Sequence, residues 1–333
     1  MMKTDEYVTI WDINKAKEVL QDNARKTPLV KSFYLTSVAE ANVYLKLENM
    51  QLTGSFKFRG AYNKIAALTT TEKEHGVIAC SAGNHAQGVA LSSKLLGINS
   101  KIVMPETAPQ AKIDATRGYG SDVVLYGQTF DEAKEKCIEI AEKTGRTFLH
   151  PYDDPAVIAG QGTIGLEILD NMWDVDTVIV PIGGGGLISG IAIALKSFNP
   201  NIRIIGVQAE NVHGMKSSFD AEKITPHYAA PTMADGCAVK VPGDITFSIV
   251  KELVDEIITV SEDELEQAMK DLLQRGKAVV EGAGALSTAA LVSDKITDYV
   301  KGKNVVCIIS GGNVDLERIS QVCEHFFSSE VVE

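Results

Sequence analysis

The sequence lacks the features of membrane proteins, disulfide-rich proteins and nucleic-acid-binding proteins. No apolar run approaches the roughly 20 residues that a membrane-spanning helix needs, and residues 1–7 lack the apolar segment of a secretory signal. The five cysteines are scattered and form neither a Cys-x-x-Cys pair nor a Cys/His cluster, which favours reduced thiols in a cytoplasmic protein without a metal site. There is no basic block and the formal net charge is −12, so we expect neither nucleic acid nor a membrane as a partner.

Two nucleotide-binding motifs are also missing. No Gly-Lys-Ser/Thr follows a glycine-rich loop, which excludes the Walker pattern. The strict Gly-x-Gly-x-x-Gly pattern fails after Gly183, because Ile188 and Ser189 stand where the third glycine should be. Glu210 nevertheless ends the next predicted strand, as the ribose-binding acid of a dinucleotide site would. This loop alone therefore leaves an NAD-dependent oxidoreductase open.

What is present is a 333-residue chain with 45% hydrophobic residues, enough for two domains or for one domain with a lobe. Strand-like apolar segments alternate with helix-like segments, and this order predicts parallel sheets with helices on both faces. We therefore predict the α/β class, with two open, mostly parallel, twisted-sheet domains and a cleft between them. The large domain would comprise residues 1–70 and 153–333, and the small domain residues 71–152.

The elements of this prediction follow from apolar periodicity and from capping residues. Strands are predicted at 43–47, 76–80, 101–104, 122–126, 147–149, 177–182, 203–207 and 305–309. Helices are predicted at 11–26, 56–68, 84–96, 111–118, 131–143, 155–170, 187–197 and 262–274, and residues 211–243 are expected to be irregular. The helix at 155–170 contains Gly160, Gly162 and Gly165, which cost stability unless close packing or a ligand requires them.

Lys57 is a candidate nucleophile. Ser55 is a plausible N-cap for the helix at 56–68, which would place Lys57 in the first helical turn. The positive end of the helix dipole and burial between Phe56 and Phe58 would both lower the pKa of the ammonium group. A neutral lysine amine can form a Schiff base with an aldehyde cofactor. The alternative is an ordinary exposed lysine of a helix.

Three loops lie at the predicted carboxyl ends of strands, where open α/β sheets bind ligands. The run Gly183, Gly184, Gly185 and Gly186 can turn successive N–H groups toward an anion at a helix start, which favours phosphate over a simple tight turn. Residues 81–88 offer backbone donors for a carboxylate and the amide of Asn84, although an asparagine helix cap beside a buried histidine explains them equally well. Residues 310–313 offer a serine hydroxyl, but taken alone they are typical of an ordinary turn.

Together these stretches resemble the fold-type II pyridoxal-phosphate enzymes, most of all the catabolic threonine dehydratases (threonine ammonia-lyases) and the related serine racemases. The four motifs that carry the resemblance occur in the family's order and span nearly the whole chain. They are Ser55-Phe56-Lys57-Phe58-Arg59-Gly60, Ser81-Ala82-Gly83-Asn84-His85, Gly183 to Gly186, and Ser310-Gly311-Gly312-Asn313.

The resemblance implies pyridoxal 5'-phosphate as the cofactor, bound in the cleft, and it assigns a role to each matching position. Lys57 would be the Schiff-base lysine and the catalytic residue. The cofactor site would comprise Lys57, Phe56, Asn84, Gly183, Gly184, Gly185, Gly186, Leu187 and Ser310, with Gly236 and Glu281 lining it. The substrate carboxylate would bind at Ser81, Ala82, Gly83, Asn84 and His85.

The implied activity is that of a dehydratase, which converts L-threonine to 2-oxobutanoate and ammonia, and L-serine to pyruvate and ammonia. The steps would be α-proton abstraction and β-elimination. Serine racemase is the alternative within the family, but racemases carry a second acid/base serine where this chain has Ala82. A non-catalytic amino-acid-binding protein built on the same cleft is a third hypothesis.

Comparison with subgroups of the family gives further expectations. Metal-binding relatives have carboxylates where this chain has Gln208 and Gly214, so we expect no divalent-metal site. We also expect no C-terminal regulatory domain, because the chain ends soon after the last predicted strand. Relatives are dimers or tetramers, which implies a homo-oligomer. Some short members are allosteric enzymes activated by AMP, and the matching positions are Thr53, Gln87, Tyr119 and Asn313.

Overall fold

The computed structural model describes residues 8–227 and 230–329 and confirms the α/β class with mostly parallel sheets. The larger sheet has six strands in the order β1 (Leu29–Lys31), β2 (Asn42–Leu47), β10 (Asn304–Ile309), β7 (Thr177–Pro181), β8 (Arg203–Ala209) and β9 (Glu256–Val260). The smaller sheet has four, in the order β5 (Asp122–Leu125), β4 (Ser100–Met104), β3 (Val77–Cys80) and β6 (Thr147–Phe148). Among the described strand pairs, β1 with β2 is antiparallel and the others are parallel.

Helices connect the strands and cover the sheets. They are α1 (Ile10–Leu20), α2 (Phe33–Ala39), α3 (Lys57–Ala66), α4 (Thr70–His75), α5 (Asn84–Leu95), α6 (Gln110–Gly118), α7 (Phe130–Thr144), α8 (Pro155–Asn171), α9 (Gly186–Phe198), α10 (Gly214–Asp220), α11 (Asp244–Leu253), α12 (Glu262–Gln274), α13 (Gly282–Val292), α14 (Thr297–Val300) and α15 (Leu316–Ser329). Two short 3-10 helices, η2 (Glu48–Met50) and η3 (Asp235–Cys237), interrupt the loops. No helix in the described ranges is long and apolar enough to cross a membrane.

The larger sheet is buried on both faces. In β7, Ile179 packs with Leu286 of α13 on one side, while Val178 and Val180 pack with the α8 and α9 side. Alternate residues of one strand point to opposite faces, so a strand covered on both sides is apolar throughout. This burial explains why residues 177–181 contain no charged side chain.

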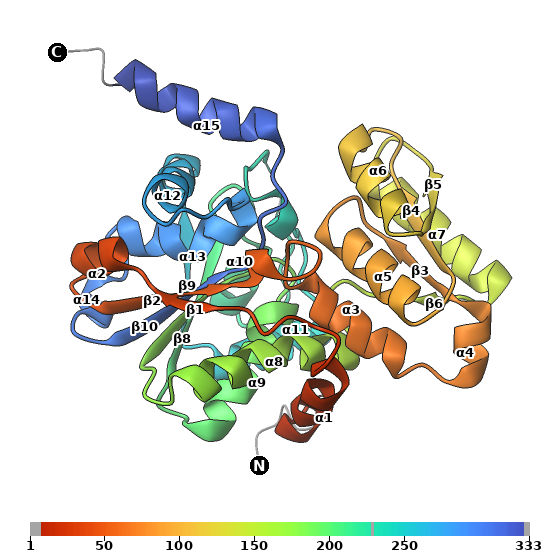
Figure 1. The fold of residues 1–333 in the computed structure, drawn as a ribbon, viewed down its shortest axis with the longest axis horizontal. Coiled ribbons are helices and arrows are strands. Elements are labelled where there is room, and N and C mark those ends of the chain that lie inside the picture. Colours follow the sequence, from red (N-terminus) through yellow and green to blue (C-terminus); the bar gives the residue numbers. More distant parts are fainter. Residues whose placement is uncertain (1–7, 228–229, 330–333) are drawn as a thin grey trace.

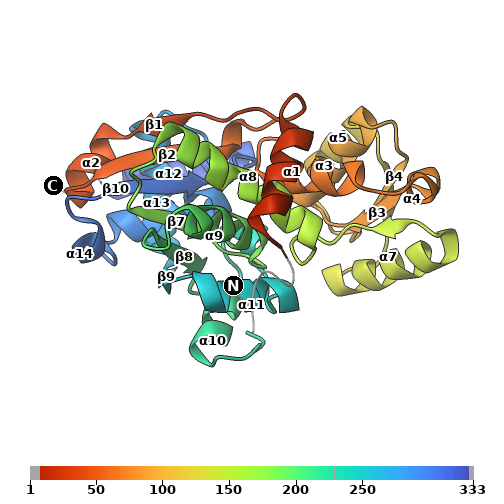
Figure 2. The same cartoon turned by 90° about the horizontal axis from the view of Figure 1, so that it is seen from below.

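The two sheets lie side by side, and α3 lies at their junction (Figure 1). It packs against α8 on the larger-sheet side and against α5 on the smaller-sheet side, and α1 also contacts it (Figure 2). The smaller sheet lies within the segment 71–152 that we predicted as the small domain. The exact division of the chain into domains remains a prediction.

Close packing explains the three glycines of α8. A Cβ on Gly160 would lie 2.7 Å from the Cα of Gly60 in α3. A Cβ on Gly162 would lie 2.9 Å from the carbonyl oxygen of Gly190 in α9, and one on Gly165 would lie 2.7 Å from a Cβ of the same helix. Of the two predicted explanations, backbone contact between helices is therefore the one that the structure supports.

Several predicted helix boundaries were wrong. The first helix ends at Leu20 rather than at residue 26. The chain beyond it is held in a non-helical course, since the side chain of Gln51 binds the backbone of Arg25 through both its carbonyl and its amide group, at 3.0 and 2.8 Å. The helix at 56–68 is shorter, from Lys57 to Ala66. The segment 211–243 is mostly irregular in its described part, as predicted, but it contains α10 and η3.

Some elements were not predicted at all. The most buried of these is α13, whose sequence GAGALSTAALV is apolar on all sides, with ten of its eleven residues buried. A helix that is buried all round shows no polar face, so its sequence lacks the 3.6-residue periodicity. The short strand β1 and the strand β9 were missed, as were α2, α4, α10, α11, α14 and α15.

Candidate active site

The segment before α3 pairs with the loop after β10. Ser55 forms an antiparallel bridge with Gly311, and the backbone N–H of Phe56 donates to the carbonyl of Ser310 at 3.1 Å. Two motifs more than 250 residues apart in the sequence are thereby joined. This pairing places Lys57 at the end of β10.

Ser55 is not the helix cap that we predicted. The N-cap of α3 is Phe56, which makes no side-chain capping bond. The hydroxyl of Ser55 is buried, and it makes no hydrogen bond within the described part of the chain. Lys57 is still in the first turn of α3, as predicted, but contacts other than a side-chain cap must fix that turn.

The amine of Lys57 is enclosed by protein. Its Nζ donates to the carbonyl of Pro151 at 2.9 Å and lies 5.1 Å from the ring centroid of Phe56. Burial lowers the pKa of Lys57 to about 8, although Cys237 and Glu281 act in the opposite direction. The predicted direction of the pKa shift is confirmed, and about a tenth of this amine is neutral at pH 7, far more than for an ordinary lysine.

Asn84 begins the helix that packs against Lys57, although it is not a helix cap. It is the first residue of α5, and Gly83 is the N-cap. A Cβ on Gly88 in the next turn would lie only 3.1 Å from the backbone carbon of Lys57, so the two helices touch here. The Asn84 amide is held on both sides, donating to Glu281 at 2.6 Å and accepting from Asn313 at 2.7 Å.

The start of α5 provides free backbone donors. Within the described residues, no hydrogen bond is formed by the N–H groups of Asn84, His85 and Ala86. His85 is buried and bonds through Nε2 to the carbonyl of Leu149 at 3.0 Å. Burial, with a contribution from Lys57, lowers its pKa to about 3, so the imidazole is neutral. This helix start can therefore bind a carboxylate through N–H groups.

The glycine turn offers a second set of donors. Gly185 is the N-cap of α9 with φ +98°, a conformation that glycine adopts without strain. The N–H groups of Gly183, Gly184, Gly185, Gly186 and Leu187 find no acceptor among the described residues. Five successive free donors at the start of a 13-residue helix fit a phosphate group.

Tyr152 covers this turn. A Cβ on Gly184 would lie 2.3 Å from the tyrosine ring, and one on Gly186 would lie 2.9 Å from its carbonyl oxygen. The hydroxyl of Thr246 donates to the Gly184 carbonyl at 2.7 Å from the other side. Packing against these residues, as well as the free N–H groups, therefore requires glycine. We did not single out Tyr152 from the sequence. It follows the carboxyl end of β6, and such strand ends are where open α/β sheets bind ligands.

Ser310 and Glu281 complete the surroundings of Lys57. Ser310 is buried, and its hydroxyl has one long hydrogen bond of 3.4 Å, to the carbonyl of Ala283. Burial, followed by the charge of Asp235, raises the pKa of Glu281 to about 8, whereas Asn84, Lys112 and Lys57 lower it. The site therefore holds a carboxyl group that keeps its proton near neutral pH.

A cavity of about 210 Å³ adjoins these residues at the junction of the two sheets. Asn84, Gly236 and Glu281 are among its lining residues. Of the residues predicted for an effector, Gln87 and Asn313 also line it, and Asn313 donates to the carbonyl of Thr53 at 2.7 Å. Tyr119 follows the last turn of α6 and is not among the lining residues.

Comparison with known proteins adds the family. Residues 20–311 match the family described as pyridoxal-phosphate dependent enzyme. The chain is 61% identical, over 97% of its length and 94% of the relative's, to the L-threonine dehydratase catabolic TdcB of Staphylococcus aureus (strain USA300).

Two solved structures have the same fold over nearly their whole length. A processed threonine deaminase isoform 2 from Solanum lycopersicum has a TM-score of 0.90 and 42% identity, covering 95% of this chain and 91% of the other. Maize serine racemase has a TM-score of 0.91 and 34% identity, covering 97% and 99%. Together with the buried amine and the two sets of free N–H groups, these matches establish that the chain belongs to the family of pyridoxal-phosphate dependent enzymes.

Proposed function

We propose that this protein is a threonine/serine ammonia-lyase, a carbon-nitrogen lyase of amino-acid catabolism. It would convert L-threonine to 2-oxobutanoate and ammonia, and L-serine to pyruvate and ammonia. The observations that carry the proposal are the buried amine of Lys57, with its lowered pKa, and the two sets of unpaired N–H groups at the starts of α5 and α9. The names of the threonine dehydratase and threonine deaminase relatives support the choice of substrate.

Each residue of the site has a role in this proposal. Lys57 would bind the cofactor aldehyde and then hold the α-proton of the substrate at Nζ. The N–H groups of residues 183–187 would hold the cofactor phosphate, with Phe56 beside it. The loop at residues 81–85 would hold the substrate carboxylate through the free N–H groups of Asn84 and His85, whereas the N–H group of Ser81 already donates to the carbonyl of Val103 at 3.2 Å. Asn84 would contact the 3-oxygen of the cofactor.

Pyridoxal phosphate, when bound, supplies an electron sink for the electron pair left by the α-proton. Ser310 would face the pyridine nitrogen. A hydroxyl there is neutral, unlike a carboxylate, so it gives no charge to keep that nitrogen protonated. This favours rapid loss of the β-hydroxyl group over a long-lived carbanion.

The test uses purified protein and pyridoxal phosphate. We expect a visible absorption band that changes when L-threonine is added, and formation of 2-oxobutanoate. Lys57→Ala should abolish both, whereas Lys64→Ala, which removes another lysine of α3 paired with Asp154 at 2.7 Å, should retain both. An active Lys57→Ala enzyme would refute the assignment.

Serine racemase is the second candidate function, favoured by the similarity to the maize racemase. Ala82 speaks against it, because its methyl group can neither donate nor accept the proton that a second face of the substrate requires. Formation of D-serine from L-serine at a rate comparable with pyruvate formation would favour the racemase. The family match to pyridoxal-phosphate dependent enzymes gives no support to the NAD-dependent oxidoreductase. For the third hypothesis, a non-catalytic amino-acid-binding protein, the expected result is binding of L-threonine without turnover.

We also propose that the enzyme is a cytoplasmic homodimer or homotetramer controlled by AMP. Its scattered reduced cysteines support the location, and the residue types at Thr53, Gln87, Tyr119 and Asn313 are the basis for the effector site. Light scattering would give the oligomeric state. Activity that is unchanged by added AMP would contradict the effector site.

A further inference from the structure

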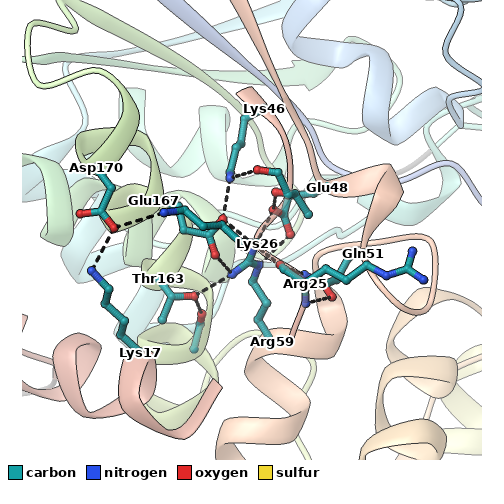
Figure 3. A network of polar contacts seen from close by, with 12 residues as sticks. Lys17, Arg25, Lys26, Lys46, Glu48, Gln51, Arg59, Thr163, Glu167 and Asp170 are labelled. Atoms are coloured by element: carbon teal, nitrogen blue, oxygen red, sulfur yellow. Dashed lines mark hydrogen bonds and ion pairs between the residues drawn. The ribbon is translucent and has the colours of Figure 1, made fainter. Parts of the chain in front are cut away.

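A buried network of charges surrounds the side chain of Arg59, two residues after Lys57 in α3 (Figure 3). Arg59 makes a bidentate contact with Glu48, through Nε and Nη2 at 2.8 Å each. It makes a second bidentate contact with Glu167 of α8, through Nη1 at 2.6 Å and Nη2 at 3.0 Å. The side chains of Arg59 and Glu48 are 1% and 0% exposed, so neither can be satisfied by solvent instead.

Lys46 completes the network. Its amine lies 2.5 Å from Glu167 and donates to the carbonyl of Thr27 at 2.7 Å. Two cations and two carboxylates are thus buried together without net charge. Burying such groups costs about as much as their attraction returns, so the network is better explained by the geometry that it imposes than by added stability.

The first turn of α3 needs such an external constraint. Phe56 gives no side-chain cap, and the Ser55 hydroxyl makes no bond among the described residues. Arg59 follows Lys57 by two residues, so the two side chains leave the helix roughly 200° apart. The two bidentate contacts of Arg59 fix the rotation of α3 about its axis. They therefore also fix the direction in which the Lys57 side chain leaves the opposite side of the helix.

We propose that Arg59 is a positioning residue for Lys57. Its planar guanidinium, held by Glu48 of η2 and Glu167 of α8, sets the rotation of α3 that directs the Lys57 amine toward the carbonyl of Pro151. The inference rests on the proposed role of Lys57 as the reactive amine. It does not depend on which amino acid the enzyme uses.

The decisive variant is Arg59→Lys. It keeps the positive charge, but one ammonium group cannot reproduce two bidentate contacts. Glu48→Gln is a milder second variant that weakens one of the two contacts while keeping an acceptor in place. Ile202→Ala serves as the control, because it creates a cavity in the core before β8, away from the carboxyl ends of the strands.

The measurement is pulse acetylation of the cofactor-free protein over a range of pH, with mass spectrometry of the peptide that contains Lys57. In the parent protein, the labelling midpoint of Lys57 should lie at about 8. In Arg59→Lys and Glu48→Gln it should rise by roughly one pH unit or more, because the amine moves out of its enclosed position. The titratable groups near Lys57 are unchanged in these variants, namely Cys237, Glu281, His85 and His150.

A second measurement uses the loaded enzyme. A displacement of about 1 Å in a reacting group lowers kcat roughly 100-fold, and we expect this for Arg59→Lys with KM changed only a few-fold. Ile202→Ala should lose thermal stability with an unchanged midpoint and kcat. If Arg59→Lys folds and keeps the parent's labelling midpoint for Lys57, the inference is wrong. If Arg59→Lys does not fold, the labelling midpoint of Glu48→Gln decides, and an unchanged midpoint again refutes the inference. An absence of dehydratase activity in the parent protein would refute the proposed function and leave the labelling result intact.

Discussion

Replacing Glu281 by glutamine should make the cofactor-free protein more stable, and increasingly so as the pH rises. Glu281 is 5% exposed and accepts a hydrogen bond from Asn84 at 2.6 Å. Burial, followed by the charge of Asp235, raises its pKa from 4.5 to about 8. Glutamine has the same shape and keeps an oxygen for Asn84, but it cannot ionise.

The sign and size of the effect follow from this pKa. Between 4.5 and about 8 the folded protein keeps the Glu281 proton that the unfolded chain releases, so the free energy of unfolding falls as the pH rises through this window. The difference between the two pKa values corresponds to about 5 kcal/mol, fully lost above about pH 8. Glu281→Gln should therefore match the parent protein near pH 4.5 and exceed its stability by up to this amount at high pH.

Urea unfolding of both proteins at several pH values measures this difference. Glu167→Gln is the contrasting variant. Burial raises the pKa of Glu167, but the charges of Arg59 and Lys46 outweigh burial, so the pKa of Glu167 lies below its ordinary value. A lowered folded pKa stabilises the protein above pH 4.5, so Glu167→Gln should destabilise it there and lose its effect in acid. Parallel pH profiles for the parent and Glu281→Gln would refute the reasoning.

Two further predictions concern packing and the junction of the sheets. Gly184→Ala should lower the free energy of unfolding by roughly 1–3 kcal/mol because its Cβ would lie 2.3 Å from the Tyr152 ring, whereas Gly118→Ala in open space should raise it by about 0.5–1 kcal/mol. Equal urea midpoints for these two variants would contradict the packing argument. Lys112→Met should cost less than about 1 kcal/mol, since the partner Asp235 of this 2.9 Å ion pair is 61% exposed. A larger loss of unfolding free energy, measured with urea, would mean that this ion pair holds α6 of the smaller-sheet part against η3 of the larger-sheet part.

Much of the parallel-sheet architecture could be predicted from local patterns. The strands β3 and β7 are apolar, the second half of β4 is apolar, and a helix-like segment follows each of them, so this alternation is visible in the sequence. The capping box of Ser261 and Glu264 marked the start of α12, and the structure has both of its bonds. These elements were predictable because their signals come from residues within a few positions of one another.

The elements that were missed have no such local signal. Helix α13 is apolar all round because four strands and a second helix layer enclose it. The helix at 11–26 was predicted too long, and its last predicted residues are instead bound by the distant Gln51, which contacts the backbone of Arg25. Ser55 was predicted as a cap because its type and position fit, but the backbone there pairs with Gly311 instead.

The sequence by itself determined the family, the order of the βα units and the identity of the groups that can do chemistry, because motifs and periodicities are written in neighbouring residues. The tertiary structure alone decided that Asn84 lies between Glu281 and Asn313, and that Arg59 is held by Glu48 and Glu167. It also decided the pKa values of Lys57 and Glu281, because burial by distant segments shifts them. Apart from the contact of Arg59 with Glu48, these contacts join residues 108 to 229 positions apart. They depend on how whole helices and sheets pack, and no local pattern in the chain encodes that packing.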